Sequence, residues 1–248
     1  MDISFQLYSA REFTPWDGVL KQLSELGYTQ VEGFAGNYED PATFRAMLNT
    51  YGLTMPSGHF FPMEQFEEDI AKVIATAKTL GMSRVFVPAV PPAQRSASKE
   101  DWSAVAKRLE AIAAQMKAAG LRFGWHNHDF EFKAFDDGSF PMEIILRDAP
   151  SLEWEMDVAW VARGGEDPLA WIERYKDRIT TAHVKDIAPE GECTDEDGWA
   201  DVGQGIMDWK AIMGALRAIG VDLFVMEHDK PSNAGRFASR SIEAFRTY

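Results

Sequence analysis

Short apolar runs alternate with longer helical patterns along the whole chain. Glycine stands at five joints where a helical pattern ends and an apolar run begins, namely Gly27, Gly52, Gly81, Gly120 and Gly220. Glycine after the last turn of a helix adopts the left-handed conformation without strain, and runs rich in Val, Phe, Met and Leu are typical of buried parallel strands. Each joint therefore predicts a passage from helix to strand.

The same pattern predicts eight strands and eight helices. We expect strands over residues 3–8, 30–33, 54–59, 84–88, 122–126, 152–157, 180–184 and 223–227. We expect helices over residues 16–26, 42–51, 66–80, 102–119, 141–147, 169–175, 209–219 and 239–246. No linker interrupts residues 1–248, so the alternation predicts a single-domain α/β protein, a closed (β/α)8 TIM barrel. The one long connection, 187–208, is acidic and contains glycines, and we interpret it as a mobile active-site lid.

Composition narrows the class of protein. The 248 residues are 46% hydrophobic, which suits one barrel with a buried core. A formal net charge of −14 argues against nucleic acid as a partner, because such binding needs clustered Lys and Arg. The chain has no apolar window long enough to span a membrane and no basic, apolar leader, and Cys193 is its single cysteine. We therefore expect a soluble, cytoplasmic protein.

Histidines and carboxylates gather at the carboxyl ends of the expected strands, where TIM barrels carry their catalytic groups. All five histidines of the chain occupy such positions: His59, His126, His128, His183 and His228. Three carboxylates lie at equivalent places: Glu32, Asp157 and Glu227. This clustering predicts an active site at that end of the barrel.

Side-chain alternation along a strand predicts which of these groups face the barrel axis. If His126 points inward, His128 does too, and the same alternation turns His183, Lys185 and Glu227 inward. His228 then points toward the helices.

Imidazole and carboxylate groups from neighbouring strands form a suitable shell for Mn²⁺, Co²⁺, Mg²⁺ or Zn²⁺. Such an ion would polarise a carbonyl while a carboxylate removes the adjacent proton. An alternative for Asp157 is a salt bridge to Lys185 inside the barrel.

The order of the motifs resembles the xylose-isomerase-like superfamily, particularly its sugar phosphate isomerase/epimerase branch, over nearly the whole chain. The motifs are GYTQVEGF with Glu32, SGHFF with His59, GWHNHDFEF with His126, EMDVAW with Asp157, AHVKD with His183, VGQGIMDW, and VMEHD with Glu227. The resemblance implies a small carbohydrate substrate and is consistent with a homodimer. It also implies a divalent metal ion held at the ends of strands five to eight by His126, Asp157, His183 and Glu227.

His126 departs from the common pattern of the superfamily, which has a glutamate at this position. Typical epimerases of this superfamily are similar in using two carboxylates on opposite faces of the substrate. The histidine-rich motif of this chain more closely resembles the motif of inosose dehydratases and related keto-sugar lyases. We expect a metal-dependent isomerase or epimerase of a keto-sugar or related polyol. The alternative is a keto-sugar or keto-inositol dehydratase.

Both reactions need the same catalytic groups. We expect Glu227 to act as the base and His126 or His128 as the acid; which of the two histidines binds the metal stays open. The residues expected to contact the substrate are Glu32, His59, Lys185 and Glu131.

Overall fold

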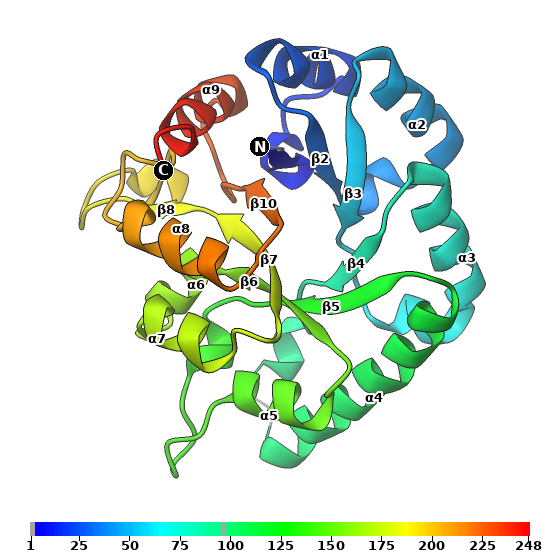
Figure 1. The fold of residues 1–248 in the computed structure, drawn as a ribbon, viewed down its shortest axis with the longest axis vertical. Helices are drawn as coiled ribbons and strands as arrows, with labels where there is room; N and C mark the ends of the chain where they lie inside the picture. Colours follow the sequence, from blue (N-terminus) through cyan, green and yellow to red (C-terminus); the bar gives the residue numbers. More distant parts are fainter. Residues whose placement is uncertain (1–2, 96–97) are drawn as a thin grey trace.

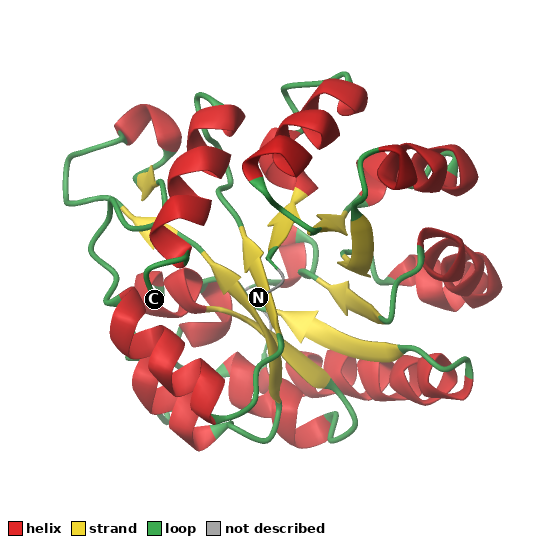
Figure 2. Ribbon diagram, turned by 45° about the horizontal axis from the view of Figure 1, so that its top comes forward, coloured by secondary structure: helices red, strands yellow, loops and turns green. Residues whose placement is uncertain are grey.

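The computed structural model describes residues 3–95 and 98–248, in which eight parallel strands form a barrel surrounded by helices (Figure 1, Figure 2). The barrel strands are β1 (Ser4–Gln6), β2 (Gln30–Gly33), β3 (Thr54–Gly58), β4 (Arg84–Val87), β5 (Arg122–His126), β6 (Glu153–Asp157), β7 (Ile179–Val184) and β10 (Leu223–Met226). The α-helices are α1 (Trp16–Leu26), α2 (Pro41–Thr50), α3 (Glu64–Leu80), α4 (Lys99–Ala118), α5 (Pro141–Asp148), α6 (Val158–Arg163), α7 (Pro168–Arg174), α8 (Trp209–Ala218) and α9 (Ala234–Phe245).

The barrel closes between β3 and β4. The strand order is β3-β2-β1-β10-β7-β6-β5-β4, so neighbours in the sheet are also neighbours in the sequence of barrel strands. A parallel bridge between His59 and Phe86 joins the two ends, and the Phe60 N–H donates to the Phe86 carbonyl at 2.9 Å. The TIM barrel predicted from the alternation of helices and strands is therefore confirmed.

The glycine joints have the predicted backbone conformation. Gly27 and Gly81 follow α1 and α3 with φ of 93° and 87°, and the N–H of each donates to carbonyls in the last helical turn. Gly124 on β5 has a different role, because a Cβ there would lie 2.6 Å from the Phe86 ring. Glycine at this position lets the Phe86 ring fill the barrel interior.

Element boundaries differ from the predictions where side chains cap the backbone. The first strand stops at Gln6 because the Gln6 side chain accepts the Tyr8 N–H and starts a 3₁₀ helix, Leu7–Ala10. Helix α6 was not predicted, and it is capped by Asp157, whose carboxylate accepts the Trp160 N–H. Helix α9 begins at Ala234 rather than at residue 239, because Asn233 caps it.

The buried carboxylate of Asp186 holds the backbone of the segment after β7. It contains two short antiparallel strands, β8 (Asp186–Ile187) and β9 (Trp199–Ala200). Asp186 accepts the N–H groups of Ile187, Gly203 and Met207 at 2.9, 2.9 and 3.1 Å. These bonds fold residues 187–208 back toward the end of β7. The mobility that we expect of this segment as a lid stays a prediction.

A second buried carboxylate ties the same segment to the end of the barrel. Glu196 is 4% exposed, accepts the Ser232 N–H at 2.7 Å and pairs with Arg236 of α9 at 2.9 Å. Burial opposes ionisation of Glu196, but these donors outweigh it and lower the pKa to about 2.

Replacing this carboxylate should destabilise the fold in a pH-dependent way. We expect Glu196→Gln to lower the free energy of unfolding by about 2–3 kcal/mol at pH 7. The folded-state pKa of Glu196 lies below the unfolded value, so this stability is present above about pH 4.5 and is lost as the pH falls toward 2. Urea denaturation at several pH values measures the difference.

Glu192→Gln is the matched control, since Glu192 is exposed on the same segment. It should change the free energy of unfolding by less than about 0.5 kcal/mol. Equal losses in the two variants would contradict the anchoring role of Glu196.

Candidate metal centre and active site

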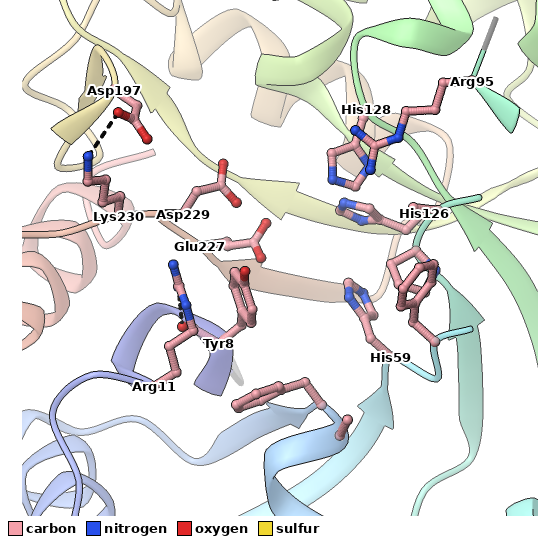
Figure 3. A pocket seen from close by; sticks show the side chains of 15 residues that line it. Tyr8, Arg11, His59, Arg95, His126, His128, Asp197, Glu227, Asp229 and Lys230 are labelled. Atoms are coloured by element: carbon pink, nitrogen blue, oxygen red, sulfur yellow. Dashed lines mark hydrogen bonds and ion pairs between the residues drawn. The ribbon is translucent and has the colours of Figure 1, made fainter. Parts of the chain in front are cut away.

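A cavity of about 510 Å³ opens at the carboxyl ends of the barrel strands (Figure 3). The close-up shows imidazole groups on one wall, labelled His59, His126 and His128, with Arg95 beside them. The facing wall carries Asp197, Glu227, Asp229 and Lys230. The aromatic rings of Tyr8, Phe34 and Phe61 also line the cavity. The cavity therefore combines a carboxylate wall, an imidazole wall and an apolar side.

Lys185 is the buried cation behind the carboxylate wall. Its Nζ lies 3.0 Å from Asp157 Oδ2, 2.9 Å from Glu227 Oε2 and 2.9 Å from Asp229 Oδ2. The side chain is fully buried, and the ring of Trp199 lies 4.8 Å from its ammonium group. The salt bridge considered for Asp157 and Lys185 is therefore present, within a larger group of carboxylates.

This ammonium group controls the charge of the carboxylates. Burial works against the charged form of Lys185, but Asp157, Asp229 and Glu227 raise its pKa above the usual range. Burial likewise opposes ionisation of Glu227, and Lys185 and His183 outweigh it, which holds the pKa of Glu227 well below its usual value. Glu227 is thus an ionised carboxylate on the cavity wall, as a general base must be.

Glu155 is a central residue of the site that the sequence reasoning missed. Its Oε2 lies 3.3 Å from His126 Nδ1 and 3.4 Å from His183 Nε2, and it also contacts His59 Nε2. Glu155 is fully buried. Strand alternation could have found it, because an inward Asp157 on β6 also turns the residue two positions earlier inward.

Glu32 lies on the far side of the same histidines. Its Oε1 is 2.7 Å from His183 Nε2 and 3.2 Å from His59 Nε2, and Gln6 and Ser57 donate hydrogen bonds to its carboxylate. It is fully buried and does not line the cavity. The structure therefore places Glu32 behind the imidazoles rather than beside a substrate.

Two overlapping sets of side chains have the composition and closeness of a metal site, with ligand atoms within 4.8 Å of one another. The outer set is His126, Asp157, His183 and Glu227, the four residues expected from the sequence. The inner set is His59, His126, Glu155 and His183. His126 and His183 belong to both. Burial and then His183 lower the pKa of His126 to about 4, so its ring is neutral near pH 7, as a metal ligand must be.

The remaining predicted residues divide between the cavity and the helix layer. His128 lines the cavity, and burial together with His126 and Lys185 keeps its pKa well below the usual value. Glu131 is turned away: its carboxylate accepts the Trp125 indole N–H and the His128 backbone N–H, both at 2.9 Å. The structure does not bring Glu131 to the cavity, and its visible role is to fix the loop after β5.

Comparison with known proteins agrees with the fold and the motifs. The model of the xylose isomerase-like TIM barrel family matches residues 20–248. The chain belongs to this family. The family assignment made from the motif order is therefore confirmed. No helix in residues 3–95 and 98–248 is long and apolar enough to cross a membrane.

The chain is similar to a protein named inosose dehydratase and to solved structures of a sugar phosphate isomerase/epimerase and of the IOLI protein. An inosose dehydratase of Geobacillus kaustophilus is 26% identical over 192 residues, which are 69% of this chain and 62% of that protein, so this chain spans less than two thirds of its relative. A sugar phosphate isomerase/epimerase from Parabacteroides distasonis superposes with a TM-score of 0.83 at 22% identity, covering 98% of this chain and 92% of the other. The IOLI protein, crystallised with a bound zinc atom, gives 0.79 at 17% identity and covers 100% and 97%.

Removing the buried ammonium should destabilise the barrel strongly. We expect Lys185→Met to lower the free energy of unfolding by about 3–5 kcal/mol, because Asp157 and Glu227 would be left buried without a cation. Urea denaturation after removal of divalent metal with EDTA measures this loss.

Lys230→Met provides the comparison at an exposed position. The Lys230 and Asp197 side chains are 55% and 58% exposed, so breaking their ion pair should cost less than about 1 kcal/mol. If the two variants unfold at the same urea concentration, Lys185 does not compensate the buried carboxylates.

Proposed function

We propose that the protein is a divalent-metal-dependent carbon–oxygen lyase that removes water from a keto-sugar or keto-inositol. The observation that carries the proposal is the difference between the cavity walls, with ionised Glu227 on one and neutral His126 and His128 on the other. Dehydration beside a carbonyl is assisted by two unlike groups, a base for the proton and a neutral hydrogen-bond donor for the departing hydroxyl.

The residues at the cavity fit a divalent metal. Buried His126 Nδ1 has no hydrogen-bond partner in the described part of the chain, and carboxylate oxygens lie within reach on two strands. Mixed nitrogen and oxygen donors favour Zn²⁺, Mn²⁺ or Co²⁺ over Mg²⁺, which prefers an all-oxygen shell. When bound, the metal supplies polarisation of the substrate carbonyl, which makes the adjacent C–H more acidic.

The protein's own groups then perform the proton transfers. Glu227 takes the proton beside the carbonyl, and Lys185 holds its carboxylate ionised and in place. His128 faces the cavity from the opposite wall and donates a hydrogen bond from its neutral imidazole N–H to the leaving hydroxyl. The proton that Glu227 has taken then passes to this hydroxyl, which departs as water. We assign the binding of substrate hydroxyls to the carboxylate of Asp229 and the ring of His59, which both line the cavity.

The relatives that are named inosose dehydratase support the lyase. The inosose dehydratase of Geobacillus kaustophilus is a lyase by name, although this chain spans 62% of its length. An epimerase with two carboxylate bases needs them on both faces of the substrate. The carboxylates that line the described cavity, Asp197, Glu227 and Asp229, all lie on one wall.

The product of the reaction tests the proposal. Enzyme loaded with Zn²⁺ or Mn²⁺ and incubated with keto-inositols and keto-sugars should release a product lighter by one water, with the ultraviolet absorption of a conjugated enone. Mass spectrometry and absorbance follow both signals. A product of unchanged mass would replace the lyase by an isomerase or epimerase, and the absence of any product across these substrates would exclude both.

Glu227→Gln should lower kcat by about 10²–10⁴-fold, because the amide cannot take the proton. Glu25→Gln is the control, since the Glu25 side chain is 66% exposed on the outer helix α1 and should leave kcat unchanged. Steady-state kinetics of the two variants beside wild type give the comparison. Wild-type kcat in Glu227→Gln would remove Glu227 from the mechanism.

A further inference from the structure

We infer that Glu131 is a positioning residue for His128, the imidazole that donates a hydrogen bond to the leaving hydroxyl in the proposed reaction. The inference rests on the proposed function and deepens it. Glu131 does not line the cavity, so it acts through the loop that carries His128 and not on the substrate itself.

Both oxygens of the Glu131 carboxyl group fix the geometry of this loop. Oε2 accepts the backbone N–H of His128, and Oε1 accepts the indole N–H of Trp125, both at 2.9 Å. Trp125 lies on β5 and is fully buried. One side chain therefore ties the backbone of His128 to the strand that precedes it.

Glu131 occupies a position where a carboxyl group is costly. It is fully buried, and no Lys or Arg contacts it in the ion pairs of residues 3–95 and 98–248. Burial raises the pKa of Glu131 to about 8, against hydrogen bonds from the backbone and from the Trp125 indole. An apolar side chain would avoid this cost but would leave two N–H groups without their acceptor. What the carboxyl group contributes is the simultaneous fixing of these two donors.

The ring of His128 is packed so that its position follows the backbone. The Phe130 ring centroid lies 5.6 Å from that of His128, with the ring planes 13° apart, and the Trp160 centroid lies at 5.3 Å. His128 Nδ1 is buried and has no hydrogen-bond partner in the described part of the chain. Since the ring also lines the cavity, Nε2 is the nitrogen left to reach a substrate (Figure 3).

Asn127 anchors the other side of His128. Its Oδ1 accepts the Trp154 indole N–H at 2.8 Å and the Asp157 backbone N–H at 2.9 Å, and its Nδ2 donates to the Asp157 carbonyl at 3.1 Å. Asn127 thus ties the loop to β6, while Glu131 ties it to β5. A shift of roughly 1 Å in a catalytic group can lower a rate by about 10²-fold, so loss of either anchor is enough to impair His128.

The first test is the rate of water loss in Glu131→Gln. The amide keeps the size of the side chain and one acceptor oxygen, but it turns an NH₂ group toward the second donor. At pH 9, above the pKa of Glu131, we expect kcat to fall by about 10–100-fold while KM stays within about threefold of wild type. Unchanged kcat would overturn the inference.

Glu143→Gln is the matched control. Glu143 also accepts a backbone N–H, from Phe140 at 3.0 Å, but it lies on α5 and does not line the cavity. This variant should keep the kcat of wild type. Equal losses of kcat in Glu131→Gln and Glu143→Gln would show a general loosening of the fold and overturn the inference.

A double-mutant cycle asks whether Glu131 acts through His128. His128→Asn removes the imidazole, so positioning it no longer matters in that background. The kcat of Glu131→Gln/His128→Asn should lie within about threefold of that of His128→Asn alone. If the two losses multiply instead, Glu131 acts elsewhere and the inference is wrong.

The ring ¹⁵N signals of His128 give a test that needs no substrate. In histidine-labelled protein these signals are assigned by their loss in His128→Asn. We expect them to shift in Glu131→Gln and to stay unchanged in Glu143→Gln. Trp125→Phe removes one donor and keeps the carboxyl group, so it should shift the same signals by a smaller amount.

These signals also distinguish failure of the inference from failure of the lyase. Unchanged His128 signals in both Glu131→Gln and Trp125→Phe overturn the positioning role, whatever reaction the enzyme performs. Shifted signals in a protein that releases no dehydrated product support the positioning of His128 and refute the lyase alone.

Discussion

Compensation of buried negative charge governs the architecture of this barrel end. Glu32, Glu155, Asp157 and Glu227 are at most 4% exposed, and Lys185 is the only Lys or Arg side chain that contacts any of them in the described ion pairs. Carboxylates cannot remain ionised there without nearby positive charge or hydrogen-bond donors. The positions of the imidazoles and of the ammonium group follow from this requirement.

The segment after β7 contributes to the same end. Trp199 of β9 is almost fully buried, and its ring lies against the Lys185 ammonium. The carboxylates of Asp186 and Glu196 hold the backbone on either side of that ring. Two acidic residues of this region, Asp186 and Glu196, are therefore internal. They fix the position of the indole that shields the cation from water.

Much of this was accessible from sequence because a parallel barrel repeats one pattern. Glycine after each helix, apolar strands and alternating side chains were enough to place His126, His183, Lys185 and Glu227 at one end of the barrel. Alternation says which side chains face inward, but not at which depth they meet, so the sequence could not distinguish two ligand sets that share two histidines. Glu131 was misplaced because a 3₁₀ turn, Phe130–Phe132, directs its carboxylate back to Trp125.

The position of His59 has a consequence for the dynamics of the fold. This residue lines the cavity and also forms the bridge to Phe86 that joins β3 to β4, so the seam of the barrel passes through the site. Any ligand that holds the His59 ring also holds the two strands together, and binding to the closed form alone stabilises it by mass action. The N–H groups of Phe60 and Ser83 form hydrogen bonds between the two sides of the seam, so their amide hydrogen exchange reports on occupancy of the cavity. In return, a change that loosens the seam weakens the binding of the ligand.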